Sequence, residues 1–177
     1  MNSKAEIRTE IRKQYANLSE TEWKERSRAL YRRIISEPEY QNAKTVFCYV
    51  SIKKEPDTWA LMQKIIDDGK RLCVPRCKDD GSMVAVSVEK LSELQKGLFG
   101  IPEPSTKNET VARNEIDLMI VPAMAADAKG NRLGKGKGYY DRFLKGSRTK
   151  GIWIVTFFMC DLPTERHDIP GERVFLG

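Results

Sequence analysis

The stretch from residue 117 to residue 144 constrains the fold more than any other part of this sequence. A short apolar run, Leu118 to Val121, is typical of a buried strand, and it leads into a loop where glycines alternate with lysines at 134–138. Tyr139 to Leu144 then has the pattern of a helix start. Glycine allows close backbone approach and positive φ, so a strand, a glycine loop and a helix can present N–H groups to phosphate. A phosphate-handling enzyme is therefore the leading hypothesis.

The positive charge of the chain is concentrated in the same region. Between Lys129 and Lys150 there are eight basic residues and one acidic residue, Asp141, so this segment carries +7 while the whole chain carries +6. A local patch of this kind attracts nucleotide phosphates, a polyanionic substrate tail or a nucleic-acid backbone. The sign of the charge alone does not choose among these ligands.

The remaining composition is that of an ordinary globular protein. A chain of 177 residues fits a single domain, residues 1–177, that can bury a core without metal or disulfide bonds. The first residues are polar and do not resemble a signal peptide, and no apolar stretch approaches the roughly 20 residues of a membrane span. We expect a monomeric, cytoplasmic protein whose partners include neither a membrane nor nucleic acid.

The alternation of helix and strand patterns predicts the fold class. Two capping boxes, Ser3 to Glu6 and Ser19 to Glu22, each begin an amphipathic helix ahead of the first strand, and Pro38 lies just beyond the second helix. A third helix begins at Asp57 or Thr58 and ends before Gly69. Strand patterns occupy residues 45–52, 71–74, 83–88, 118–121 and 152–158, and residues 100–114 read as a loop. We expect a three-layer α/β/α fold with a mainly parallel sheet.

The glycine loop matches neither of the two common nucleotide-binding signatures. Gly134-x-Gly136-x-Gly138 lacks the third-glycine spacing of the dinucleotide-binding fingerprint, and no Gly-Lys-Ser/Thr completes a P-loop. The alternative is a flexible basic surface loop. Its position between a strand and a helix favours phosphate binding.

Three carboxylates lie where ligand-binding groups are expected. Asp141, in the first helical turn after the glycines, could hold Mg²⁺ against phosphates, or it could stabilise the helix dipole. Asp168 could be a second metal ligand or a turn residue before Pro170. Glu55 follows the first strand, where α/β folds place ligand groups at strand carboxyl ends. Its alternative role is that of a solvated loop residue.

Other polar residues give less specific signals. Lys4 and Arg8 share one face of the first helix and could reach phosphate, although a solvated face explains them equally well. His167 is the only histidine, and a lone histidine is more typical of a structural or surface position.

The run from Arg132 to Arg142 closely resembles the signature of the 5-formyltetrahydrofolate cyclo-ligase family, whose members are also called methenyltetrahydrofolate synthetases. Other stretches agree in order and spacing: Lys4-x-x-x-Arg8, Tyr49-Val-Ser-x-x-x-Glu55, Val74-Pro-Arg76, Gly100-Ile-Pro-Glu-Pro104, Ile120-Val-Pro122, and Leu162-Pro followed by His167-Asp168. The resemblance covers nearly the whole chain.

This resemblance implies an ATP- and Mg²⁺-dependent ligase that closes 5-formyltetrahydrofolate, with or without a polyglutamate tail, to 5,10-methenyltetrahydrofolate. The formyl oxygen attacks the γ-phosphoryl group, N10 attacks the activated carbon, and ADP and phosphate are released. Lys137 and Arg132 are implied to be catalytic. The implied ligand sets are, for ATP, Lys4, Arg8, Arg132, Leu133, Gly134, Lys135, Gly136, Lys137, Gly138, Tyr139 and Tyr140; for the folate, Val50 and Glu55; and for magnesium, Asp141 and Asp168.

Two positions depart from the family pattern. Ala126 stands where the family usually has an aromatic residue, and Phe157 falls at the position of a family glutamine. These changes suggest a homologue that binds nucleotide and folate with weak or altered turnover as one alternative. A second alternative is a module that binds single-stranded nucleic acid, because Tyr139 and Tyr140 adjoin the basic patch. Asp141 and the glycines interrupt that patch, which favours the ligase.

Overall fold

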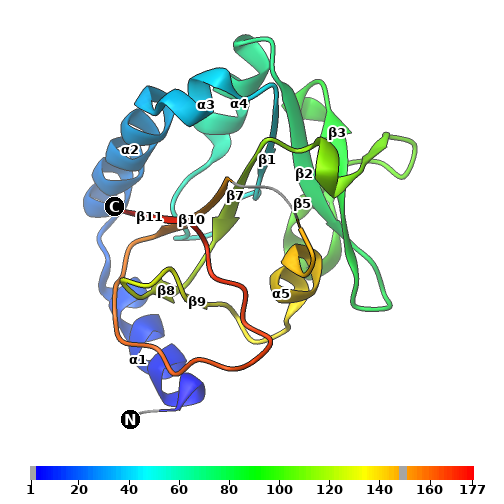
Figure 1. Ribbon diagram of the computed structural model, residues 1–177. Helices are drawn as coiled ribbons and strands as arrows, with labels where there is room; N and C mark the ends of the chain where they lie inside the picture. Colours follow the sequence, from blue (N-terminus) through cyan, green and yellow to red (C-terminus); the bar gives the residue numbers. More distant parts are fainter. Residues whose placement is uncertain (1–2, 148–150) are drawn as a thin grey trace.

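A seven-stranded sheet forms the centre of the molecule, with helices around it (Figure 1). The computed structural model describes residues 3–147 and 151–177. In order across the sheet, the strands are β11 (Arg173–Leu176), β10 (Ile152–Thr156), β7 (Leu118–Pro122), β1 (Thr45–Cys48), β2 (Arg71–Cys77), β3 (Met83–Val88) and β6 (Thr110–Val111). The strands from β11 to β2 pair in parallel, whereas β3 runs antiparallel to both β2 and β6. The predicted mainly parallel sheet is confirmed.

The other elements are helices, short 3₁₀ turns and small hairpins. The α-helices are α1 (Lys4–Asn17), α2 (Glu20–Ser36), α3 (Pro38–Asn42), α4 (Trp59–Asp67) and α5 (Tyr139–Leu144). The 3₁₀ turns are η1 (Leu91–Glu93), η2 (Leu98–Gly100) and η3 (Arg113–Glu115). The hairpins pair β4 (Gln95–Lys96) with β5 (Pro102–Glu103), and β8 (Ala125–Ala126) with β9 (Arg132–Leu133).

Alternating side chains along the strands divide the core into two layers. Val46 of β1 packs in one cluster with Leu30 of α2 and Ile65 of α4. The next residue, Phe47, points to the opposite face and packs against Phe143 of α5, with 5.1 Å between the ring centroids. Successive strand residues face opposite sides of a sheet, so each face buries its own set of apolar side chains. The expected three-layer arrangement is confirmed, with α5 on the second face.

Both predicted capping boxes are present. The Ser3 hydroxyl accepts a hydrogen bond from the Glu6 N–H, and the Glu6 carboxylate accepts one from the Ser3 N–H; Ser19 and Glu22 make the same reciprocal pair. A further helix, α3, precedes the first strand and was not predicted. It begins at Pro38, whose fixed φ and missing N–H suit the first position of a helix. Three helices, rather than the expected two, therefore precede β1.

Several strand boundaries differ from the prediction. β1 ends at Cys48, and β2 continues through Pro75 to Cys77. Proline is tolerated there because β1 is paired with β2 only as far as Cys73, so the later part of β2 runs beside β3 alone. Residues 100–114 contain β5 and β6, and β11 was not predicted. Strands of two residues, such as β5 and β6, are too short to show a periodic pattern.

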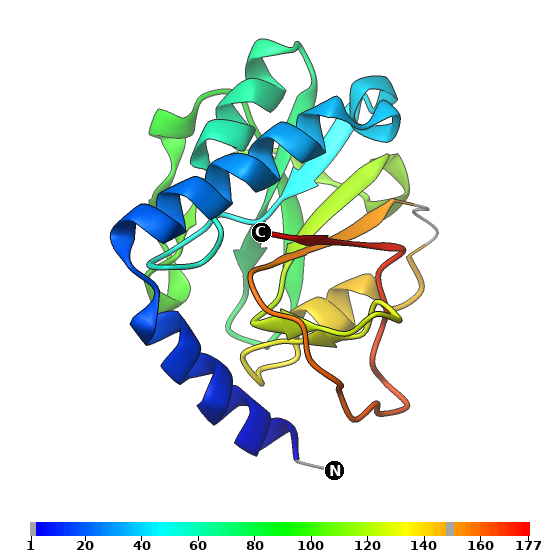
Figure 2. The same ribbon diagram turned by 90° about the vertical axis from the view of Figure 1, so that its left-hand side faces the viewer.

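The parallel strands bring distant loops to one edge of the sheet. The loops that follow β1, β7 and β10 leave the sheet at the same end, because parallel strands share their direction. Helix α1 lies next to the N-terminal start of α2 and runs alongside the loops that follow β7 and β10 (Figure 2). Its Ile11 side chain is buried against Leu133 and Leu162 of those loops. Among the described helices, none is long and apolar enough to cross a membrane.

The capping box of α2 gives a stability test. We expect Ser19→Ala to lower the free energy of unfolding by about 1 kcal/mol, because it removes the acceptor for a helical N–H group. Ser19→Asn keeps a side-chain acceptor and is the matched control. Urea denaturation measures both variants, and equal stability of Ser19→Ala and the wild type would contradict the role of this cap.

Candidate functional site

The glycine loop lies between β9 and α5. The sequence predicted the helix after the loop, but it placed the loop directly after the strand that is now β7. Gly136 has φ +97° and Gly138 has φ +70°, conformations that glycine adopts readily. The predicted helix start at Tyr139 is confirmed, and α5 ends at Leu144. The β8–β9 hairpin separates the loop from β7. Because α5 has only six residues, its dipole is small, and the positive potential here comes mainly from side chains.

A groove of about 410 Å³ runs beside this loop. It is lined by Gly136, Lys137, Gly138, Asp141, Arg142, Lys145 and His167. The loop therefore supplies one wall, α5 supplies a second, and the segment after β10 supplies the third. Arg148 and Lys150, which contribute to the predicted +7 segment, lie outside the described residues.

A partly buried ion pair joins the two ends of the loop. Arg132 Nη2 lies 2.6 Å from Asp141 Oδ1, and the Arg132 side chain is only 4% exposed. The Arg132 guanidinium also lies over the Tyr140 ring, 5.4 Å from its centroid. Arg132 Nε is buried without a hydrogen-bond partner among the described residues. The predicted metal ligand Asp141 thus shares its carboxylate with a predicted catalytic residue.

Helix α1 reaches the site through its first turns. Lys4 Nζ donates to both carboxylate oxygens of Asp168, at 2.8 Å each. One turn later, Arg8 Nε donates to the Gly134 carbonyl at 2.8 Å. Arg8 also covers Gly136, where an added Cβ would lie 3.5 Å from its guanidinium carbon. The predicted neighbours Lys4 and Arg8 therefore contact the site, and the solvated-face alternative is wrong.

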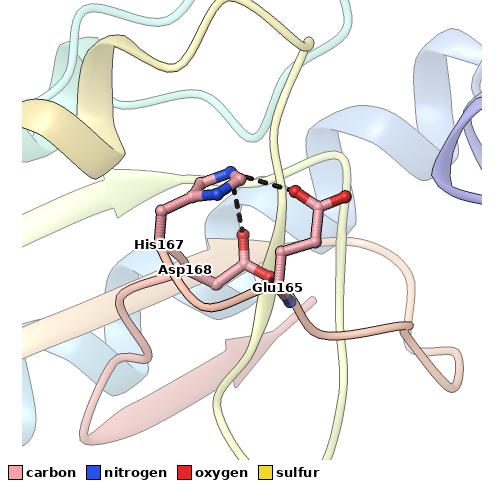
Figure 3. A group of neighbouring side chains, drawn as sticks. All are labelled: Glu165, His167 and Asp168. Carbon is pink, nitrogen blue, oxygen red and sulfur yellow. Dashed lines mark hydrogen bonds and ion pairs between the residues drawn. The ribbon is translucent and has the colours of Figure 1, made fainter.

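Asp168 belongs to a group with Glu165 and His167 (Figure 3). One ligand atom from each of the three lies within 4.8 Å of the others. His167 Nε2 lies 3.0 Å from Glu165 Oε2 and 4.0 Å from Asp168 Oδ1. Asp141 is not part of this group, although it lines the same groove as His167. Of the two predicted magnesium carboxylates, Asp141 lines the groove, whereas Asp168 is bonded to Lys4 and reaches the groove's edge only through its neighbour His167.

The residues predicted to contact folate lie in the loop that follows β1. Glu55 Oε1 is 2.5 Å from Lys135 Nζ, and Glu55 Oε2 accepts the Ile52 N–H at 3.0 Å. Glu55 is therefore tied to the glycine loop and is not a free solvated residue. Val50 is only 3% exposed, so its side chain belongs to the core. Burial raises the pKa of Tyr140 well above its usual range, and the charge of Glu55 adds to that shift.

The predicted ATP-binding set divides by exposure. Lys135, Gly136 and Lys137 are exposed and face solvent or the groove. Leu133 is fully buried and packs beneath the loop with Ile11. Leu133 therefore supports the loop from the protein interior.

Sequence analysis missed two residues that shape the loop. Phe99, in η2, is 50% exposed and has a left-handed φ of +59°. Lys137 Nζ lies 3.2 Å from the centroid of its ring, and the Tyr139 ring lies 5.9 Å away. Arg142 donates to the Lys137 carbonyl at 2.9 Å. Phe99 is remote in sequence, so no local pattern places it here.

The two departures from the family pattern are both internal. Ala126 is completely buried within β8, and Phe157 is 1% exposed after β10. The centroids of the Phe157 and Tyr15 rings are 6.2 Å apart. The guanidinium carbon of Arg26 lies over the Phe157 ring, 4.7 Å from its centroid. Both substitutions are therefore accommodated by core packing.

Comparison with known proteins gives a consistent result over the whole chain. Residues 1–176 match the model of the 5-formyltetrahydrofolate cyclo-ligase family. The chain is 32% identical to the 5-formyltetrahydrofolate cyclo-ligase of Haemophilus influenzae, over 97% of this chain and 96% of that protein. It is 31% identical to the Mus musculus cyclo-ligase, over 98% and 93% of the two chains.

Solved structures agree. The 5,10-methenyltetrahydrofolate synthetase of Aquifex aeolicus is 34% identical and superposes with a TM-score of 0.84, covering 97% of this chain and 88% of that one. A 5,10-methenyltetrahydrofolate synthetase from Mycoplasma pneumoniae is 20% identical and has the same fold, with a TM-score of 0.80 over 98% of each chain.

The Lys4–Asp168 contact gives a pH-dependent test. Burial raises the pKa of Asp168, but hydrogen bonds from Lys4 and from the Glu165 N–H outweigh burial, so the net pKa is lowered. A lowered folded-state pKa contributes stability above the ordinary aspartate pKa of about 3.9, and this contribution is lost as pH falls through the folded-state value. We expect hydrogen exchange in the first two turns of α1 to accelerate in that acidic window.

Asp168→Asn is the control for this titration. It removes the ionisable group, so backbone amides in the first turns of α1 should exchange hydrogen faster at neutral pH than in the wild type. In acid they should show no further acceleration, because there is no carboxylate to protonate at position 168. An acid-induced acceleration of the same size in Asp168→Asn would assign the effect to another group.

Proposed function

The chain belongs to the 5-formyltetrahydrofolate cyclo-ligase family, and we propose that it binds ATP and Mg²⁺ in the groove beside the glycine loop. A cyclo-ligase of this family closes 5-formyltetrahydrofolate to 5,10-methenyltetrahydrofolate, and that is the reaction of this enzyme. The products of the nucleotide are ADP and phosphate. The observation that carries the site assignment is the exposed lysine of the loop, Lys137, facing a groove that Asp141 also lines.

The chemistry requires positioning and charge neutralisation more than a protein nucleophile. The formyl oxygen is a weak nucleophile that attacks the γ-phosphoryl group, after which N10 attacks the activated carbon and phosphate leaves. Phosphoryl transfer spreads negative charge over the transferred oxygens, so cations and N–H donors held in place lower its barrier. The glycine loop supplies backbone N–H groups beside such cations.

Lys137 is the residue we assign to the transferred phosphoryl group. Among the described residues, no carboxylate lies within 4 Å of its ammonium group, whereas Lys135 is paired with Glu55. Lys137 rests instead on the Phe99 ring, a contact that leaves its positive charge unneutralised. Arg132 is fixed by Asp141 and supplies positive charge from beneath the loop.

Carboxylate oxygens of the kind that Asp141 and Asp168 supply suit magnesium. Mg²⁺ prefers oxygen ligands and is usually held by one or two carboxylates together with substrate phosphates. Asp141 has one oxygen paired with Arg132, and its other oxygen is the one we assign to the metal. Asp168 would become the second ligand by giving up a hydrogen bond from Lys4. When bound, Mg²⁺ would neutralise charge on the β- and γ-phosphates.

The folate would occupy the side of the loop nearest the end of β1. Glu55 offers a carboxylate there for hydrogen-bond donors of the substrate, and its ion pair with Lys135 links the two substrate regions. Val50 would shape the strand end through its backbone, because its side chain is buried. The basic residues of the loop would favour an anionic polyglutamate tail where the substrate carries one.

The broader expectations from the sequence stand as proposals. We propose that residues 1–177 act as one domain and as a monomer in the cytoplasm, without nucleic acid or a membrane as partner. The family match over residues 1–176 supports the single domain. Light scattering of the purified protein measures its oligomeric state directly.

The two alternative functions have less support. Weak turnover was suggested by Ala126 and Phe157, but both are packed in the interior, where they affect the shape of the site only indirectly. A nucleic-acid module requires free positive charge along a surface. Arg132 and Lys135 are each paired with a carboxylate, which reduces the charge available to a phosphate backbone.

The decisive assay is formation of 5,10-methenyltetrahydrofolate from 5-formyltetrahydrofolate, followed by its near-ultraviolet absorbance. Product should require both ATP and Mg²⁺. Absence of product from folded protein that binds ATP would contradict the proposed reaction. Product formed without Mg²⁺ would contradict the proposed metal.

Lys137→Ala tests the assignment of the loop. We expect kcat to fall by about 100-fold, because a cation beside the transferred phosphoryl group is removed. Lys129→Ala removes the same charge from the same basic segment, in the turn between β8 and β9, and should leave kcat unchanged. If both variants lower kcat equally, Lys137 contributes only to the overall positive charge of the segment and has no specific role at the phosphoryl group.

Asp141→Asn tests the proposed metal ligand. We expect the Mg²⁺ concentration for half-maximal activity to rise by about tenfold or more, because a neutral amide is a weaker ligand than a carboxylate for a hard cation. Titration of activity against Mg²⁺ at saturating ATP measures this shift. An unchanged Mg²⁺ requirement would leave Asp141 with the structural role of pairing Arg132.

A further inference from the structure

Arg142 connects the glycine loop to a turn that does not line the groove. Its Nε and Nη2 atoms donate to the Gly81 carbonyl, at 3.0 and 2.8 Å, and Nη2 also donates to the Lys137 carbonyl at 2.9 Å. The guanidinium lies over the Tyr139 ring, 5.2 Å from its centroid. Gly81 belongs to the turn between β2 and β3, sixty-one residues before Arg142 in the chain.

The turn that carries Gly81 is fixed by its own hydrogen bonds. The Lys78 N–H donates to the Ser82 carbonyl at 2.8 Å, and the Gly81 N–H donates to the Lys78 carbonyl at 3.1 Å. Asp80 Oδ1 accepts the Ser82 N–H at 2.9 Å and the Ser82 hydroxyl at 2.6 Å. A short side chain that bonds the backbone two residues ahead holds a turn in one shape. The Gly81 carbonyl therefore has a defined position.

The glycine loop is closely fitted to the arginine. A Cβ added at Gly138 would lie 2.7 Å from Arg142 Nη1, and one added at Gly81 would lie 3.5 Å from Nη2. Gly138 and Gly81 also have positive φ values of +70° and +83°. Glycine at position 138 thus serves the close approach of the guanidinium as well as the bend of the chain.

We propose that the turn at residues 78–82, acting through Arg142, is a positioning element for the nucleotide-binding loop. Arg142 fixes the carbonyl of Lys137 and so sets the direction in which the Lys137 side chain and the following amides face the groove. The inference rests on the proposed binding of ATP at this loop. No residue of the turn lines the groove, so its effect on nucleotide affinity passes through Arg142.

Asp80 variants separate this role from the effect of charge. Asp80→Ala removes the acceptor that shapes the turn, whereas Asp80→Asn keeps a side-chain oxygen in the same place. Both variants remove one negative charge near a polyanion, which by itself would strengthen ATP binding. We expect Asp80→Ala to raise the Kd of ATP by about threefold despite the charge effect. This increase corresponds to part of the roughly 1 kcal/mol that one lost side-chain acceptor costs. Asp80→Asn keeps the turn and should bind ATP as tightly as the wild type or slightly more tightly.

The measurement is calorimetric titration of the whole enzyme with a non-hydrolysable ATP analogue and Mg²⁺. Arg142→Ala should raise the Kd by roughly tenfold, since charge-assisted hydrogen bonds to two carbonyls and one positive charge at the groove are lost. In the Arg142→Ala background, Asp80→Ala should add nothing further, because the connection is already broken. The KM for 5-formyltetrahydrofolate should remain at its wild-type value in every variant.

Arg113 provides a matched control. Its Nη1 donates to the Phe143 and Lys145 carbonyls at the far end of α5, at 2.6 Å each. Arg113→Ala should lower the thermal unfolding temperature while leaving the Kd of ATP unchanged. If Arg113→Ala weakens ATP binding as much as Arg142→Ala, general loosening of α5 explains the effect and the proposal is wrong.

The remaining outcomes are also decisive. Equal Kd values for Asp80→Ala, Asp80→Asn and the wild type would overturn the role of the turn, while leaving the ATP site intact. Additive effects of Asp80→Ala and Arg142→Ala would mean that the two residues act separately, which also overturns the proposal. A wild-type protein that does not bind the analogue would overturn this inference and the proposed function together.

Discussion

The ion pair between Arg132 and Asp141 is the interaction on which the site depends. It joins the short strand β9, which precedes the glycine loop, to the first turn of α5, nine positions after Arg132, so it closes the loop at its base. Arg132 is almost completely buried, and a buried cation is strongly unfavourable without a partner. Removing Asp141 would leave that cation unpaired, so the conformation of the loop and its electrostatic potential depend on the same contact.

Similar pairs attach the rest of the molecule to this centre. Lys4 brings the start of α1 to Asp168, and Lys135 brings the loop to Glu55 at the end of β1. Each pair joins a cation proposed to contact ATP with a carboxylate proposed to bind metal or folate. Each of these cations is therefore neutralised by a carboxylate of the protein before any ligand binds. This pairing reduces charge repulsion within a strongly basic segment when its ligands are absent.

Local sequence patterns predicted much of the fold. The capping boxes at Ser3 and Ser19 placed the first two helices, and the glycine loop placed the start of α5 at Tyr139, because caps and glycine loops depend on neighbouring residues. The strand β6 escaped prediction because two residues show no period, and β11, near the end of the chain, escaped it as well. The family was also predicted correctly, since the loop signature is long and continuous.

The sequence by itself determined which chemical groups the site contains: alternating glycines and lysines, and carboxylates at positions 55, 141 and 168. Only the tertiary structure decided how these groups are paired. It placed Leu133 beneath the loop and Val50 in the core, and it brought Phe99 and Arg142 against Lys137. The reason is physical: propensity and capping act over a few residues, whereas burial and charge pairing depend on which distant segments the parallel sheet brings together.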